Sequence, residues 1–443
     1  MVGSKKQRLG ALEKAYVGIL LVIFGGIVLH APLSVGFGTL FPNYDLLIKS
    51  WKEIFMGVAA VIALILLRRH RQTKILREPL MIGIEVYAGI HLLTLILFRN
   101  NLDSTLAGLM IDLRYILFFV LVYVAVRLYT DFRQLFIKVG IAGALIVMLF
   151  ALLQVFILPV DVLKYIGYDI NNIAPYLTVD QNHDFIRINS TLRGPNPLGA
   201  YAVIILAPLV AWLVSKKSKS DKKTVLVVSI LIFGGIVSLW SSYSRSALIA
   251  AIIAVAVVLG TTVMHRFSRR VLVATAVICI AAIGGLVAMR DSSVVSNIIL
   301  HENPGESNSI NSNEGHVISL QDGLSRMLRQ PFGAGIGSTG SDSLMDDKPL
   351  IIENQYLFIG HEIGWLGLAV FILIFIGVMN RLWVRRQDWL ALGVFASGLG
   401  MAVIGLFLPV WTDDTVAIIW WGVAATVVAG RWYIVDSSKA KKL

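Results

Sequence analysis

Residues 354–379 read NQYLFIGHEIGWLGLAVFILIFIGVM, and this stretch decides the class of the fold. It opens with the motif N-x9-G-x2-G, formed by Asn354, Gly364 and Gly367, and continues as an apolar run. A helix rises about 1.5 Å per residue, so the stretch is long enough to cross the roughly 30 Å hydrocarbon core of a bilayer. The sequence therefore predicts a transmembrane helix with this motif at its N-terminal mouth.

The whole chain has the same character. Of its 443 residues 57% are hydrophobic and only 15% are charged, and the mean hydropathy is +0.77. A soluble domain cannot bury that much apolar surface, so we predict an all-α fold, a polytopic transmembrane helical bundle forming one integral membrane domain over residues 1–443. About twelve spans are expected, at 15–33, 52–67, 79–98, 105–126, 134–157, 198–214, 224–240, 246–263, 271–288, 354–379, 389–409 and 414–431.

The distribution of positive charge predicts the topology. The chain has 39 Lys and Arg residues and a net charge of +12. Most of these residues form short clusters in every second loop, as the positive-inside rule expects, so both termini are predicted on the cytoplasmic side of a cytoplasmic (inner or plasma) membrane. Because the clusters alternate with apolar runs, the charge indicates membrane lipids as partners and argues against nucleic acid.

Two of the loops assigned to the outer side are long: 158–197, and 289–353 between spans nine and ten. Loops longer than about 15 residues are usually functional or disordered. In the second loop Val317, Leu320 and Leu324 recur at helical spacing, which predicts a surface helix over 315–329 that lies on the outer leaflet or caps the bundle.

Two arginines are expected at the outer surface. Arg193 lies in the segment RGPNPLG (193–199) just before span six, and Arg245 lies in the short turn SSYSRS (241–246). A guanidinium group offers a rigid fork of donors that suits phosphate oxygens, so the two can clamp a pyrophosphate, with Asn196 as a further ligand. The alternative is that each arginine binds a lipid headgroup or caps a helix end.

Arg114 is expected well inside span four, with Asp112 close by. A charge at that depth is costly unless it is paired or hydrated, so it marks a candidate site, and Arg114 is a third candidate ligand of the pyrophosphate. The alternative is an ion pair that ties helices together, with Asp112, or with Glu85 and His91 of span three, as the partner.

Glu353 and Asn354 begin span ten, where a carboxylate can serve as general base toward a sugar hydroxyl. The alternative is an N-terminal cap of the helix. Asn354 and His361, which share a helix face, are further catalytic candidates, although membrane histidines often only bond one helix to another. Tyr356 and His316 are weaker candidates. No spacing of ligand residues resembles a metal site, and no cofactor-binding motif occurs.

Four segments, taken in order, resemble the O-antigen ligase and O-antigen polymerase superfamily of bacterial membrane glycosyltransferases. They are 193–199 (RGPNPLG), Ser244-Arg245, 331–337 (PFGAGIG) and 354–367. The resemblance implies transfer of a glycan from undecaprenyl pyrophosphate to a glycan, lipid or protein acceptor on the outer face of the membrane, without nucleotide sugar or metal. It also implies that Arg193 and Arg245, which match arginines of the family, contact the pyrophosphate.

The sequence departs from the family at the usual catalytic histidine, where Glu353 stands before the N-x9-G-x2-G motif. Three interpretations stay open: Glu353 is the base, His361 or His316 replaces it, or the chain belongs to a polymerase-like branch without that histidine. A transporter or flippase of envelope precursors is the main alternative function, and a non-catalytic scaffold is a third. The outer-face polar residues favour the transferase, because transport needs a site near the midplane.

Overall fold

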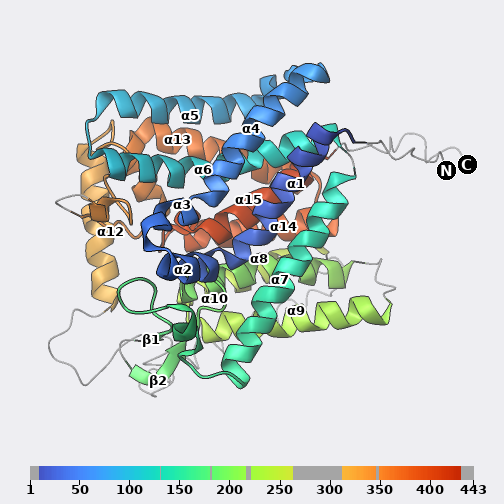
Figure 1. Ribbon diagram of the computed structural model, residues 1–443, viewed down its shortest axis with the longest axis vertical. Helices are drawn as coiled ribbons and strands as arrows, with labels where there is room; N and C mark the ends of the chain where they lie inside the picture. Colours follow the sequence, from blue (N-terminus) through green and yellow to red (C-terminus); the bar gives the residue numbers. More distant parts are fainter. Residues whose placement is uncertain are drawn as a thin grey trace, which may run out of the picture.

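The computed structural model describes residues 9–129, 131–179, 182–215, 221–262, 312–345 and 349–430. Helices dominate these ranges (Figure 1). Their bounds are α1 Ala11–Gly26, α2 His30–Leu40, α3 Asp45–Lys49, α4 Trp51–Arg69, α5 Pro79–Leu97, α6 Leu102–Leu128, α7 Phe132–Phe156, α8 Pro195–Val214, α9 Lys222–Ser241, α10 Arg245–Thr262, α12 Ser312–Arg329, α13 Gln355–Val384, α14 Trp389–Ile404 and α15 Asp414–Val428.

Within the described ranges, eight helices are long and apolar enough to cross a membrane. The segment Pro42–Lys49 meets α4 at a bend of 43°, and the two are long and apolar enough to cross a membrane only when taken together. The helices α14 and α15 are apolar but shorter. The chain is therefore a helical, multi-pass membrane protein, as its composition predicts. The predicted span 271–288 and the first part of the loop 289–353 lie outside the described residues.

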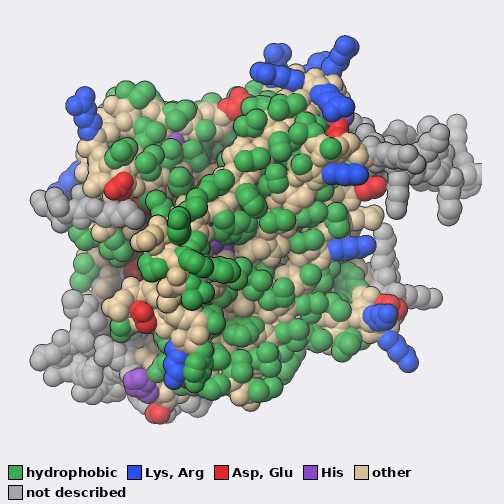
Figure 2. Space-filling model, in the orientation of Figure 1, with side chains coloured by type: hydrophobic (Ala, Val, Ile, Leu, Met, Phe, Trp, Pro, Cys, Tyr) green, Lys and Arg blue, Asp and Glu red, His purple; other side chains and the backbone are tan. Residues whose placement is uncertain are grey.

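Polar contacts define two opposite ends of the bundle. At one end lie the starts of α1, α5, α7 and α14 and the ends of α4, α6, α13 and α15. Contacts linking them are Glu13–Arg69, Glu78–Arg127, Arg133–Asp388 and Arg385 with the carbonyls of Val427 and Val428. We call this the basic end, because Lys and Arg side chains gather there, on the right in Figure 2. The opposite end holds the four motif segments, and we call it the motif end.

Aromatic side chains fill the centre of the bundle. Trp420 and Trp421 of α15 are fully buried, with ring centroids 5.1 Å apart, and Trp411 lies 5.3 Å from Trp420. Tyr115 and Phe119 of α6 approach Trp421 at 5.5 and 5.7 Å. Large rings contribute much buried area, so this cluster fixes α15 against α6.

The loop 158–197 contains a short antiparallel hairpin of β1 (Leu177–Val179) and β2 (Asn182–Arg187), with Leu177 opposite Arg187. These two strands were not predicted, because we expected an all-α fold. The hairpin leads directly to the segment of Arg193, so it positions one of the candidate ligands.

The surface helix predicted over 315–329 is present as α12, which begins three residues earlier, at Ser312, and ends at Arg329. It lies across one end of the bundle, at the left in Figure 1. Val317 and Leu328 are exposed, while Gly323 approaches Ile352 and Leu357. The helix therefore covers the start of α13 with one face.

Candidate functional site

Two of the motif segments meet backbone to backbone. The turn 331–337 docks on α13, where the N–H groups of Ala334 and Gly335 donate to the carbonyls of His361 and Glu362 at 2.6 and 3.1 Å. The helix kinks here because Gly364 adopts φ 74° and ψ −178°, a conformation essentially restricted to glycine. A Cβ on Gly364 would lie 2.5 Å from the Pro331 carbonyl oxygen, so glycine is required for this contact.

The docked turn reaches into the bundle. Gly337 donates its N–H to Glu362 Oε1 at 2.9 Å. A Cβ on Gly108 would lie 2.6 Å from Asp342 Oδ2, so Asp342 packs directly against α6. Gly108 is six residues into α6, so the contact lies roughly 9 Å from the start of that helix. Irregular backbone at such depth is tolerated where protein surrounds it.

Acidic side chains converge below this turn. Asp112 and Glu362 both interact electrostatically with Asp342, and His91 Nε2 lies 3.6 Å from Asp112 Oδ2. Burial and the Asp112 carboxylate raise the pKa of Asp342 to about 7. The carboxyl group of the loop residue Asp342 therefore titrates near neutral pH.

The other two motif segments also meet. Arg187 donates from Nε to the Ser242 carbonyl at 2.9 Å and from Nη2 to Asn196 Oδ1 at 2.6 Å. A Cβ on Gly199 would lie 2.8 Å from both Ser242 Oγ and the Cβ of Ala247, so α8 and α10 approach closely there. These contacts place the segments of Arg193 and Arg245 side by side.

The connection 405–413 joins the two pairs of segments. Asn354 Nδ2 donates to the Leu406 carbonyl at 2.9 Å, and the Trp411 N–H donates to Gln355 Oε1 at 2.7 Å. The guanidinium of Arg193 interacts electrostatically with the buried carboxylate of Asp413 on the same connection. All four segments thus lie at the motif end around one connection.

Arg114 is buried in α6, but its partners differ from those expected. It forms an ion pair with Asp414 and donates to the Thr412 carbonyl, both some 300 residues away. Lys52 and His30 also contact Asp414, at 2.8 and 3.0 Å. Asp112 and Arg114 are two residues apart on one helix and do not face each other.

Glu85, the other partner considered for Arg114, is exposed on α5, so that interpretation was wrong. His91 instead approaches Asp112. The alternative of a pair tying helices together describes Arg114 better, since it joins α6 to α15.

The two residues at the start of α13, Asn354 and Glu353, have different partners. Asn354 is the N-cap, and its Oδ1 accepts the N–H groups of Tyr356 and Leu357 at 2.9 and 3.0 Å. The capping considered for Glu353 therefore belongs to its neighbour. Glu353 is half-buried, and its backbone N–H donates to Ser319 Oγ of α12 at 3.0 Å.

The remaining candidates are spread over the motif end. Arg193 is exposed and Arg245 is half-buried at the start of α10. The Tyr356 hydroxyl donates to the Ala402 carbonyl at 3.0 Å, so it joins α13 to α14. His361 is buried within electrostatic range of Arg326 of α12. The side chain of His316 lies outside the described residues.

Sequence reasoning missed several ionisable residues at this end, namely His30, Lys52, Arg187, Asp342, Glu362, Asp413 and Asp414. The signal for Asp413 and Asp414 was present, since a pair of carboxylates at the start of an apolar run calls for a partner. Among the described residues, no group of three His, Cys, Asp or Glu is arranged to hold a metal ion. No protein-family model and no curated protein match the chain.

Proposed function

We propose that the chain is a membrane glycosyltransferase that moves a glycan from undecaprenyl pyrophosphate to an acceptor hydroxyl, in the manner of O-antigen ligases and polymerases. In this proposal the basic end faces the cytoplasm and the motif end faces outward. The proposal keeps the twelve predicted spans: eight described helices are long and apolar enough to cross a membrane, α14 and α15 are apolar but shorter, and the predicted span 271–288 lies outside the described residues.

One observation carries the proposal. Four segments that are up to about 170 residues apart in the chain, and that were singled out by their resemblance to one family, meet at one end of the bundle. If these segments served stability alone, the cationic segments and the kinked glycine segment would not need to lie around the same connection. If they form one site, they must lie together.

The chemistry assigned to these residues is a single displacement. The acceptor oxygen attacks the anomeric carbon, the bond from that carbon to the pyrophosphate oxygen breaks, and its electron pair leaves with undecaprenyl pyrophosphate. Arg193 and Arg245 stabilise the charge that grows on the leaving group, and Glu353 takes the hydroxyl proton. Arg114 is engaged by Asp414, so we assign it the positioning of the 410–414 connection.

The test is complementation of a deletion strain, with surface glycans and lipid-linked intermediates measured together. We expect wild type to restore surface polymer, whereas Arg245→Ala and Glu353→Gln leave undecaprenyl-linked glycan to accumulate. Arg99→Ala is the matched control, because Arg99 is an exposed arginine at the same end outside the four segments. A deletion strain with unchanged glycans would refute the transferase, and rescue by Glu353→Gln would remove Glu353 as the base.

A second candidate function, transport of an envelope precursor, is favoured by a specific observation. The pair of His91 and Asp112 is buried, and Asp112 is ten residues into α6, roughly 15 Å from its start and near the middle of a bilayer. Ionisable groups at the midplane are typical of transporters. In proteoliposomes a flippase would move a labelled lipid-linked glycan across the bilayer and lose this activity in Asp112→Asn, whereas the transferase would not translocate it.

A further inference from the structure

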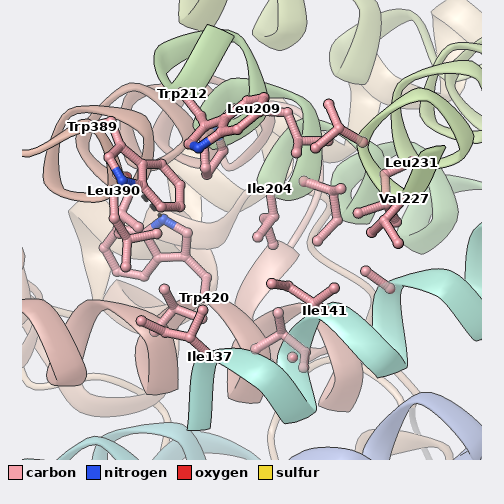
Figure 3. Close-up of a pocket in the computed structure, with 18 of the residues that line it drawn as sticks. Ile137, Ile141, Ile204, Leu209, Trp212, Val227, Leu231, Trp389, Leu390 and Trp420 are labelled. Atoms are coloured by element: carbon pink, nitrogen blue, oxygen red, sulfur yellow. Dashed lines mark hydrogen bonds between the residues drawn. The ribbon is translucent and has the colours of Figure 1, made fainter. Parts of the chain in front are cut away.

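A cavity lies between helices in the half of the bundle toward the basic end. It has a volume of about 400 Å³ and is partly open to the outside. Figure 3 shows its walls: Ile137 and Ile141 of α7, Ile204 of α8 and Val227 of α9 surround one common space. The volume falls within the roughly 300–1,000 Å³ of sites that bury a small ligand.

The cavity follows from how three helices cross. Toward the motif end α7 and α9 are tightly packed, since a Cβ on Gly234 would lie 2.6 Å from the Cβ of Met148. A Cβ on Gly235 would lie 2.8 Å from Leu206, so α8 closes on α9 at the same level. From this crossing α7 and α9 diverge toward the basic end, as Figure 1 shows. The space that opens between them is the cavity.

The lining excludes most ligands. Nearly all of the described side chains that line it are aliphatic or aromatic, and Lys223 is the one charged residue among these described residues. An apolar space of this kind is a poor site for water, which needs two to four polar partners. Ile141 is exposed where α7 borders the cavity, so the opening faces the surroundings of a membrane-spanning helix. A hydrocarbon chain is the ligand that fits such walls.

The residues at the rim of the cavity, nearest the basic end, indicate the headgroup that accompanies the hydrocarbon chain. Trp212, Lys223 and Trp389 line the cavity at the ends of their helices nearest the basic end, and Lys223 is exposed. Tryptophan and lysine in this position are typical of the level of lipid headgroups. An ammonium group at that level attracts an anionic phosphate, and its stem can follow the apolar wall.

We propose that this cavity binds one acyl chain of an anionic phospholipid from the leaflet at the basic end, with the lipid phosphate paired to Lys223. The site lies at the opposite end from the four motif segments, so it does not depend on the proposed glycan transfer. The bound lipid fills the gap where α7 and α9 diverge and holds the two helices at a fixed angle.

The test uses the full chain in nanodiscs of phosphatidylcholine with phosphatidylglycerol that carries a photoreactive diazirine in one acyl chain. Adducts are mapped by mass spectrometry after illumination. Val227→Trp fills the cavity, and Leu226→Trp is its matched control, because Leu226 neighbours Val227 but is exposed outside the cavity. Lys223→Gln removes the headgroup contact, and Lys222→Gln is the control at an exposed lysine that does not line the cavity.

We expect adducts on the α7, α8 and α9 residues of the wall, lost in Val227→Trp and kept in Leu226→Trp. Labelling should fall about fivefold in Lys223→Gln, the factor that corresponds to one interfacial lysine, and stay constant in Lys222→Gln. Unlabelled phosphatidylglycerol should compete in the wild type, which needs no variant to fold. Equal competition by phosphatidylcholine, stronger competition by undecaprenyl phosphate, or no adducts on the wall would each overturn the proposal.

Discussion

Replacing Gly364 by alanine should release the turn 331–337 from α13. The two segments are joined by the N–H groups of Ala334 and Gly335, which donate to carbonyls of α13, and by the Trp365 N–H, which donates to the Pro331 carbonyl at 2.9 Å. All three bonds lie within three residues of Gly364. A change in the backbone at that position therefore acts on the whole contact.

The magnitude follows from two costs. Gly364 has φ 74°, and a residue with a Cβ loses roughly 1–3 kcal/mol in such a conformation. The new Cβ would also lie 2.5 Å from the Pro331 carbonyl oxygen and 2.7 Å from the carbonyl carbon of Phe332, which are backbone atoms that cannot rotate away. Overpacking of this kind costs about 1–3 kcal/mol. Together they predict a loss of at least about 2 kcal/mol, or a factor of about 30 in local opening.

Hydrogen exchange followed by mass spectrometry measures this opening directly, because the amides of Ala334 and Gly335 are protected only while the turn is docked. We expect their exchange to accelerate by about 30-fold or more in Gly364→Ala. Gly377→Ala on the same helix is the control, since among the described residues its Cβ would meet only Leu80, at an ordinary 3.6 Å. Unchanged protection in Gly364→Ala would refute the reasoning from backbone geometry.

Two further predictions concern buried charge. Asp414→Asn should leave Arg114 without its main partner and lower stability by about 3–5 kcal/mol, seen as a loss of monodisperse protein on size exclusion, whereas Asp45→Asn at an exposed ion pair should cost less than about 1 kcal/mol. The folded protein holds a proton on Asp342 up to about pH 7, above the range near 3.8 where an unfolded chain releases it, so this contribution to stability is present near pH 4 and lost as pH rises toward 7. Thermal melting of Asp342→Asn should lack that part of the pH dependence; an identical profile for both proteins would count against the assignment.

The helices were predictable because the sequence pattern that forms each of them lies within one short stretch of the chain. Apolar runs placed α1, α4 through α10 and α13 through α15 near their observed positions, and helical spacing around Val317 found α12, whereas α3 and most of α2 fall between the first two predicted spans. The start of α13 was also within reach, since Asn354 is a residue type that caps helices. These features depend only on residues a few positions apart.

The interior of the site was less predictable because its contacts are long-range. Arg114 reaches the carbonyl of Thr412 across 298 residues, and Gly108 packs against Asp342 of a loop. No local pattern records such a pair, so Glu85 and His91 of the neighbouring span were considered instead. The contact between Gly337 of the turn 331–337 and Glu362, seven residues into α13, is of the same long-range kind.

The contacts of Asp414 also bear on the order in which the helices are synthesised. Asp414 follows Lys52 and Arg114 by 362 and 300 positions in the chain, so both cations are made well before this partner. Glu53 of α4 lies 3.2 Å from Lys52 Nζ and 3.8 Å from Arg114 Nη1, so one carboxylate is available to both cations before α15 exists. A buried charge is costly unless it is paired. Docking of α15 therefore completes a neutralisation that α4 begins.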